Sequence, residues 1–173
     1  MKRELLAWIG DRLVGHLHDD NGVWSFRYAE GWTAFDLCPN LPRAQGIIVD
    51  NSSQRPVQWY FDNLLPEEGQ RQLLAADARL EASDAFALLA YYGAESAGSL
   101  TLLPPDTSLP AGELRALTHE ALARRIAAMP RLPLTHEAHK RMSLAGAQHK
   151  LAVVLEDGRL HEPVGAAPST HIL

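Results

Sequence analysis

The first third of the chain contains three short runs of apolar and aromatic residues, each separated from the next by turn-forming residues. The runs cover residues 5–9, 13–18 and 23–28. Gly10 and Asp11 separate the first two runs, and Asn21-Gly22 precedes the third. Because an Asn-Gly pair readily adopts the positive φ angles of a tight hairpin turn, the pattern predicts an antiparallel β meander.

The residues after the meander predict a connector followed by helices. Residues 37–51 contain two prolines and Gly46, which indicates an extended connector. Apolar spacing and helix-end signals predict helices at residues 57–65, 67–80 and 84–92. Pro56 suits the first turn of the first helix, because the N–H that it lacks would have no partner there. For the third helix we expect Ser83 as the N-cap and Gly93 in the left-handed conformation after its end.

The second half of the chain continues with further elements and ends in a predicted hairpin. The pattern predicts a strand at residues 99–103, a proline-rich linker at 104–110 and a helix at 113–129. A polar stretch at residues 131–141 and a small-residue loop at 143–150 follow. The last apolar runs, residues 151–155 and 159–163, flank Asp157-Gly158. That pair favours a tight turn, so the two runs predict a β hairpin.

Composition narrows the class of protein. With 173 residues and 46% hydrophobic content, the chain can bury the core of one domain, or of one domain plus a fragment. Sixteen Lys and Arg residues against 21 Asp and Glu residues give a net charge of −5, which disfavours direct binding of nucleic acid through a basic face. The single cysteine, Cys38, excludes an internal disulfide and fits a reducing compartment.

No segment has the pattern of a membrane span or of an export signal. The longest uncharged apolar stretch, residues 85–94, is far shorter than the roughly 20 residues that cross a bilayer. The apolar stretch at residues 5–9 is too short to be the core of a secretory signal. We therefore expect a cytoplasmic protein without membrane contact.

Residues 143–150 are the strongest candidate for chemistry. Small residues allow backbone N–H groups to approach a phosphate closely, and a nearby cation strengthens the binding. Ala145, Gly146, Ala147 and Lys150 meet this description. The segment has neither the Walker pattern nor the G-x-G-x-x-G pattern of protein kinases, so a plain turn beside a strand stays open as the alternative.

Histidine and carboxylate patterns indicate structural roles. His136 and His139 are three positions apart, whereas a zinc-protease helix needs four. His16 and His18 share one strand face without a third ligand, which favours hydrogen-bonded or solvated histidines over a metal site. Asp62, together with the following asparagine, is expected to hold neighbouring backbone in place.

The four tryptophans fit a core better than a base-stacking surface. They are Trp8, Trp24, Trp32 and Trp59. Binding of nucleic acid would need a positive surface to attract the phosphate backbone, and the charge pattern predicts none. We therefore expect these side chains to be buried.

Three separated segments together resemble the HipA family of serine/threonine kinase toxins. Residues 60–69, YFDNLLPEEG, resemble its FDNLLP signature. Residues 93–102 resemble its G-x-D-S-x-G-A segment, with Glu95 in place of the usual aspartate. Residues 143–150 resemble its S-x-A-G-A-Q-x-K loop, with His149 where glutamate is frequent. The resemblance spans nearly the whole chain.

The resemblance implies an α+β fold. Residues 1–105 would form an N-terminal antiparallel β meander or barrel-like subdomain with packed helices, and residues 106–139 a linker and helix. Residues 140–173 would form the first strands of a kinase-like N-lobe, including a Gly-rich loop and a β hairpin.

The resemblance also implies a function for the full-length protein. HipA-type toxins of type II toxin–antitoxin systems use ATP and Mg²⁺ to phosphorylate serine or threonine on a protein such as an aminoacyl-tRNA synthetase. A HipB-like helix-turn-helix antitoxin binds the toxin and also binds DNA, so DNA would be contacted only indirectly. The family's nucleotide-binding loop corresponds to Ala145, Gly146, Ala147, Gln148, His149 and Lys150, and its autophosphorylated serine corresponds to Ser143.

The catalytic residues of the family are not matched in these 173 residues. Residues 169–173 resemble the T-H-I-x-K strand without its nucleotide-anchoring lysine, and neither the catalytic-loop aspartate nor the metal-binding aspartate is matched. The chain alone is therefore expected to be inactive. Two alternatives stay open: a non-catalytic module that restrains or completes a separately encoded HipA-like kinase, and a degraded gene product. The loop at 143–150 argues against the module, which would have no use for half an N-lobe.

Overall fold

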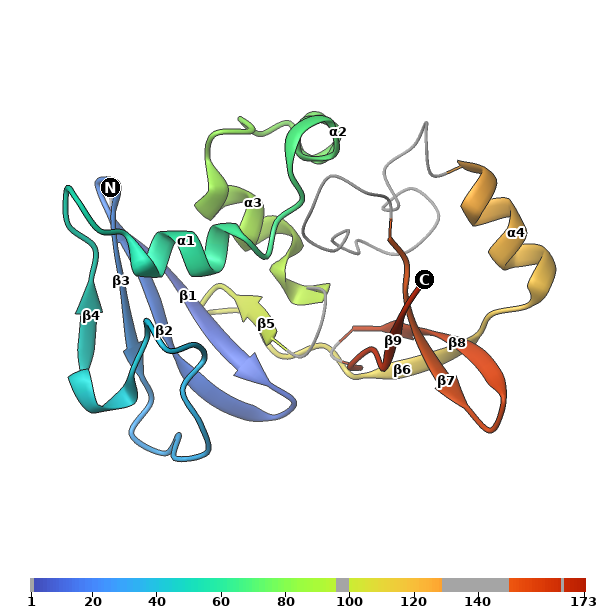
Figure 1. Cartoon of the computed structure of the whole chain (residues 1–173), viewed down its shortest axis with the longest axis horizontal. Coiled ribbons are helices and arrows are strands. Elements are labelled where there is room, and N and C mark those ends of the chain that lie inside the picture. Colours follow the sequence, from blue (N-terminus) through green and yellow to red (C-terminus); the bar gives the residue numbers. More distant parts are fainter. Residues whose placement is uncertain (1, 96–99, 129–149, 166) are drawn as a thin grey trace.

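The computed structural model describes residues 2–95, 100–128, 150–165 and 167–173. Their strands form two antiparallel sheets, one of five strands and one of four. The two sheets lie side by side, and helices α1 to α3 lie with the larger one, as Figure 1 shows. The fold is therefore α+β, as expected from the sequence.

The larger sheet contains the predicted meander. Its strands are β1 (Lys2–Ile9), β2 (Arg12–Asp20), β3 (Val23–Tyr28), β4 (Ile47–Val49) and β5 (Leu100–Leu103), in the order β4-β3-β2-β1-β5. Asn21 and Gly22 have φ angles of 53° and 86°, as a type I′ hairpin turn requires. The register places Leu5, Leu17 and Phe26 side by side on one face, and all three are buried. Because successive side chains of a strand point to opposite faces, these apolar residues gather on the one face that the core covers.

β4 was not predicted. The segment that we interpreted as an extended connector contains a short 3₁₀ helix, η1 (Arg43–Gln45), and then β4, which pairs with β3. A strand of three residues is too short to produce an alternating pattern in the sequence, and its existence depends on pairing with a distant segment.

Three helices cover the apolar face of this sheet. They are α1 (Pro56–Asp62), α2 (Glu68–Ala78) and α3 (Ala85–Tyr92), close to the predicted ranges. Both carboxylate oxygens of buried Asp50 accept backbone N–H groups at the start of α1, from Val57 and Gln58, each at 2.9 Å. These bonds satisfy N–H groups that have no partner inside the helix.

Two details of α3 differ from the sequence prediction. Its N-cap is Asp84 and not Ser83, because the Asp84 carboxylate accepts from the Ala87 N–H at 3.0 Å. Gly93 has φ −64° and is not left-handed. Instead, a Cβ at Gly93 would lie 2.6 Å from Leu102 Cβ, so close packing of η2 (Gly93–Glu95) on β5 demands a glycine there.

The smaller sheet contains the predicted hairpin. Its strands are β6 (Glu113–Ala116), β7 (Ala152–Glu156), β8 (Arg159–Val164) and β9 (His171–Ile172), in the order β6-β8-β7-β9. The turn between β7 and β8 has φ angles of 50° at Asp157 and 73° at Gly158. Residues 104–112, which connect the two sheets, contain no helix or strand.

The predicted helix at residues 113–129 is wrong in its first part. Residues 113–116 form β6 because they pair with β8, and the helix α4 (His119–Ala128) begins only afterwards. The Thr118 hydroxyl accepts from the Ala121 N–H at 3.2 Å at the start of this helix. Pairing with a strand about fifty positions away in the sequence outweighs the local helical spacing.

The expectation that all four tryptophans are buried holds for two of them, because Trp8 is only half-buried and Trp59 is exposed. Trp24 and Trp32 are 3% and 5% exposed, whereas Trp59 on α1 is 59% exposed. Trp59 lies on the side of a short helix that faces away from the core. Among the described helices, none is long and apolar enough to cross a membrane.

Candidate functional site

Most of the predicted phosphate-binding loop lies outside the described residues. This applies to Ser143, Ala145, Gly146, Ala147, Gln148 and His149. The structure describes Lys150, which is half-buried, and the sheet that begins directly after it. The described part of the site therefore consists of Lys150 and the strands next to it.

Backbone pairing brings the end of the chain beside Lys150. Leu151 and Leu173 exchange two backbone hydrogen bonds, both of 2.9 Å. The register continues with Ala152 opposite Ile172 and with the next residue of β7 opposite His171. Residues 169–173 resemble the T-H-I strand of HipA proteins. They thus lie next to Lys150, the last residue of the small-residue loop.

Thr170 fixes β9 against β7. Its backbone N–H donates to the Val153 carbonyl and its hydroxyl oxygen accepts from the Leu155 N–H, both at 3.0 Å. The hydroxyl also lies 2.8 Å from Nδ1 of His171. Backbone and side-chain bonds from one residue hold a two-residue strand that would otherwise be too short to be stable.

A small hydrophobic core and one ion pair, both largely buried, join α4 to this sheet. Leu117, Leu151 and Val153 are buried together, with side chains from α4 packed against them. Arg125 of α4 binds both carboxylate oxygens of Glu162 on β8, each at 2.8 Å, and both side chains are only 11% exposed. Bidentate pairs of this kind fix geometry, so α4 is held firmly on the sheet.

The described part of the site consists of Lys150 and the backbone of the hairpin that follows it. No group of three or more His, Cys, Asp or Glu residues in the described part of the chain could hold a metal ion. The chemistry that the arrangement offers is a hairpin that follows a small-residue segment, with Lys150 at its start. Such a hairpin can present backbone donors and a cation to phosphate groups.

The other sequence candidates have structural roles. The Asp62 carboxylate pairs with Arg71 at 2.7 Å, and Nε of the same arginine donates to the Ala82 carbonyl, also at 2.7 Å. Asn63 is exposed and ends α1. Asp62 thus has a structural role, as expected, but it acts through Arg71, which was missed, and not by a direct bond to neighbouring backbone. The only sequence signal was an isolated arginine in an alanine-rich helix.

The paired histidines lie beside Glu4, and His16 is hydrogen-bonded to it. Nδ1 of His16 lies 2.8 Å from Oε1 of Glu4, and Nε2 of His18 lies 3.4 Å from the same oxygen. Burial lowers the pKa of His18 despite the opposing effect of Glu4. Glu4 was not predicted, because its contact depends on the register between β1 and β2.

Known proteins resemble this chain in sequence along almost its entire length. The putative kinase Y4mE of Sinorhizobium fredii is 36% identical over 183 aligned residues, which cover 99% of this chain and 43% of the relative. The serine/threonine-protein kinase toxin HipA of Shewanella oneidensis is 26% identical, with coverage of 95% and 38%. The chain thus spans less than half the length of these relatives.

A solved structure and a family model agree with these relatives. The complex of Shewanella oneidensis HipA, HipB and operator DNA contains a chain that matches with a TM-score of 0.68 and 26% identity, covering 97% of this chain and 39% of that chain. The sequence model of the HipA N-terminal domain matches residues 5–103, which is more than half of the chain. The chain therefore belongs to the HipA family, and it contains the family's N-terminal domain.

Proposed function

We propose that this chain is the N-terminal part of a HipA-type serine/threonine kinase toxin of a type II toxin–antitoxin system. The observation that carries the proposal is the pairing of β9 with the start of β7. This pairing brings two segments together that resemble nucleotide-binding parts of the family, Lys150 and residues 169–173. The names of the two relatives, a putative kinase and a kinase toxin, support the proposal.

In the proposed kinase the small-residue loop holds ATP. Backbone N–H groups of residues 145–149 and the Lys150 ammonium bind its phosphates, and Mg²⁺ binds with the nucleotide. Phosphoryl transfer is accelerated mostly by positioning and by cations that neutralise developing charge. Ser143 is the proposed autophosphorylation site, where a phosphate would add about −1.5 to −2 charges beside the loop and repel ATP.

The proposed partners follow from the family. The solved relative is bound to HipB and operator DNA, and we propose a HipB-like helix-turn-helix antitoxin as the partner here. A net charge of −5 agrees with contact to DNA only through that antitoxin. The proposed substrate is a protein such as an aminoacyl-tRNA synthetase, and the proposed location is the cytoplasm.

The proposed domain boundaries follow the resemblance to the family, although β6, which lies within residues 106–139, pairs with β8 of the last segment. Residues 1–105 form the N-terminal subdomain, residues 106–139 a linker and helix, and residues 140–173 the start of the kinase domain. By themselves these 173 residues transfer no phosphate, because the lysine and the carboxylates that would act on ATP and Mg²⁺ are not matched among them.

Transfer of labelled phosphate tests this proposal. The 173-residue chain and the protein encoded by the complete reading frame around it are each incubated with γ-labelled ATP and Mg²⁺. We expect label in the complete protein, lost on Ser143→Ala, and none in the 173-residue chain. Label at Ser143 of the short chain would disprove its inactivity, and an unlabelled but folded complete protein would contradict the kinase assignment.

A non-catalytic binding module is the second candidate. One observation favours it: the larger core consists entirely of residues between Leu5 and Leu102, so this part has a core of its own. Under this alternative the reading frame stops near Leu173, and the purified chain changes the activity of a separately encoded HipA-like kinase. A frame that continues for about 250 family-like residues, the size of a kinase domain, excludes it.

A further inference from the structure

β4 is an edge strand in the part of the chain that the structure describes. It pairs with β3, with Ile48 opposite Phe26, and the Asp50 N–H donates to the Trp24 carbonyl at 2.8 Å. In an antiparallel ladder the hydrogen-bonding direction alternates, so Ile47 and Val49 direct their N–H and C=O groups away from the sheet. No described strand pairs with these groups.

This edge has only one of the features that limit strand addition, its shortness. Natural sheets also protect edges with charges, prolines or bulges. β4 contains none of these, and the side chains of Ile47 and Val49 are 55% and 54% exposed. The strand therefore offers both free backbone groups and apolar side chains to another strand.

A hollow lies on each side of the edge. The one on the α1 side has a volume of about 530 Å³, and the one on the opposite, open face of the sheet about 580 Å³. Ile47 and Val49 line both hollows. Successive side chains of an added strand point to opposite faces, so one set would enter each hollow.

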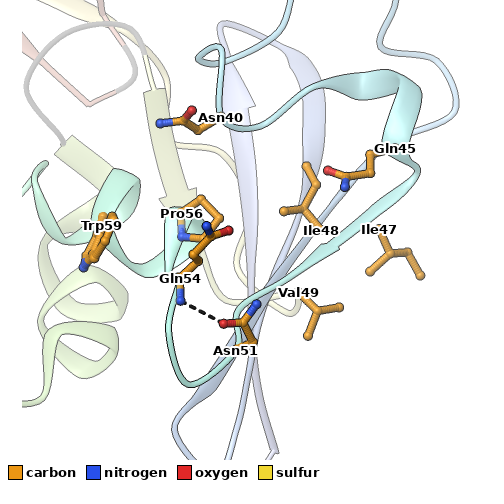
Figure 2. Close-up of a pocket in the computed structure, with 9 residues that line it drawn as sticks. All are labelled: Asn40, Gln45, Ile47, Ile48, Val49, Asn51, Gln54, Pro56 and Trp59. Atoms are coloured by element: carbon orange, nitrogen blue, oxygen red, sulfur yellow. Dashed lines mark hydrogen bonds between the residues drawn. The ribbon is translucent and has the colours of Figure 1, made fainter.

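The α1-side hollow is suited to uncharged groups. Its lining, shown in Figure 2, consists of Asn40, Gln45, Ile47, Ile48, Val49, Asn51, Gln54, Pro56 and Trp59. The amide side chains can both donate and accept hydrogen bonds, and exposed Trp59 offers a flat apolar surface. A charged group would lose hydration there without gaining a counter-charge.

The open-face hollow has a cation beside the edge. Arg27 lines it, is exposed, and lies directly opposite Ile47 in the register of β3 and β4. The described residues form no ion pair with Arg27 within 4.0 Å. Lys2 and Asp20, which stand opposite each other on β1 and β2, also line this hollow. The charge that would complement Arg27 is therefore negative.

We propose that β4 binds an extended segment of a partner protein as an added strand. Uncharged side chains of that segment face Trp59, and an acidic side chain on the other face meets Arg27. A second copy of this chain fits less well, because its own β4 would bring only Ile47 and Val49 to the open face. Main-chain hydrogen bonds supply affinity in such complexes, and the alternating side chains supply specificity.

Panning of a displayed library of random heptapeptides against the 173-residue chain tests this inference. We expect enrichment of peptides with uncharged residues at alternate positions and an acidic residue between them. Their affinity is then measured by fluorescence anisotropy. Val49→Pro removes an outward N–H and should weaken binding about tenfold or more, whereas Val49→Thr keeps that N–H and should change it little. Trp59→Ala should cause a similar loss, and Arg27→Gln a smaller, salt-dependent one.

Several results would overturn the inference. One is that panning enriches no peptide from the library. Another is that the enriched peptides bind the Val49→Pro chain with the same affinity as the unchanged chain. Self-association that Val49→Pro abolishes would place a second copy on the edge instead. Far-UV circular dichroism checks the fold of each variant, and Ile47→Lys replaces Val49→Pro if the latter does not fold. None of these readouts depends on ATP or on kinase activity.

Discussion

Arg3 connects segments of the larger sheet and its helices that are far apart in the sequence. Its guanidinium binds the carboxylates of Asp19 on β2 and Asp84 at the start of α3, and it lies 4.8 Å above the ring of Phe86. Burial opposes ionisation of Asp84, but hydrogen bonds from Arg3 and from the Ala87 N–H outweigh it and lower the pKa of Asp84. One arginine thus joins a strand, a hairpin and a helix cap.

Removal of this arginine should destabilise the fold in a pH-dependent way. Arg3→Gln leaves Asp19, which is 2% exposed, without its cation, and should lower the unfolding free energy by roughly 1–2 kcal/mol at pH 7. Because the folded pKa of Asp84 is lowered, its contribution is complete above the ordinary aspartate pKa and is lost as the pH falls through the lowered value. The difference in unfolding free energy between the unchanged protein and the Arg3→Gln variant should therefore become smaller in acid.

Urea unfolding at pH 7 and near pH 3 measures this gap. Arg159→Gln is the control, because Arg159 is exposed and lies in the other sheet. A gap that stays constant or widens in acid would show that ionisation of Asp84 is not involved. Solvent screens Asp84, which is 37% exposed, so most of the loss at pH 7 comes from Asp19.

At the scale of single residues, the sequence predicted the type of group better than its identity. An N-cap at the start of α3 was expected, and a carboxylate one residue later provides it. Asp84 is preferred to Ser83 because it also binds Arg3, which is 81 positions away in the sequence. Trp59 could not be predicted as exposed, because a short helix of mostly apolar residues does not reveal which side faces the core.

At the scale of elements, the sequence predicted those whose signals are local. The meander and the β7–β8 hairpin have alternating runs and turn residues with positive φ. β4 and β6 were missed because each is short and depends on a partner strand elsewhere in the chain. For the same reason, the hairpin after the small-residue loop was predicted, but not the pairing of β9 beside it.

Gly93→Ala tests how closely η2 approaches β5. The added Cβ would lie 2.6 Å from Leu102 Cβ and 2.8 Å from the Leu102 carbonyl oxygen, so backbone must move. We expect a loss of about 1–3 kcal/mol in unfolding free energy, typical of overpacking. Gly31→Ala is the matched control, because nothing lies within 4 Å of its added Cβ. Equal stability of the two variants in thermal unfolding would contradict the close approach.

At the scale of the whole molecule, the described residues form two separate cores. The larger contains residues between Leu5 and Leu102, and the smaller is centred on Leu117, Leu151 and Val153. The smaller core contains far fewer residues than the larger one, and the Arg125–Glu162 pair joins α4 to β8 beside it. The proposed nucleotide loop therefore precedes the sheet with the smaller core.

Limited proteolysis should separate the two cores. With subtilisin, which cuts at many residue types, we expect a resistant fragment of residues 1 to about 105. The earliest cuts should fall at residues 104–109, which hold no helix or strand, or at residues 131–141, whose composition is polar. Mass spectrometry of the fragments identifies the cuts. Phe61→Ala is the control: Phe61 is fully buried, so its loss should cost about 3–5 kcal/mol and remove the resistance. Early cleavage inside α1 of the unchanged chain would show that the larger core is not an independent unit.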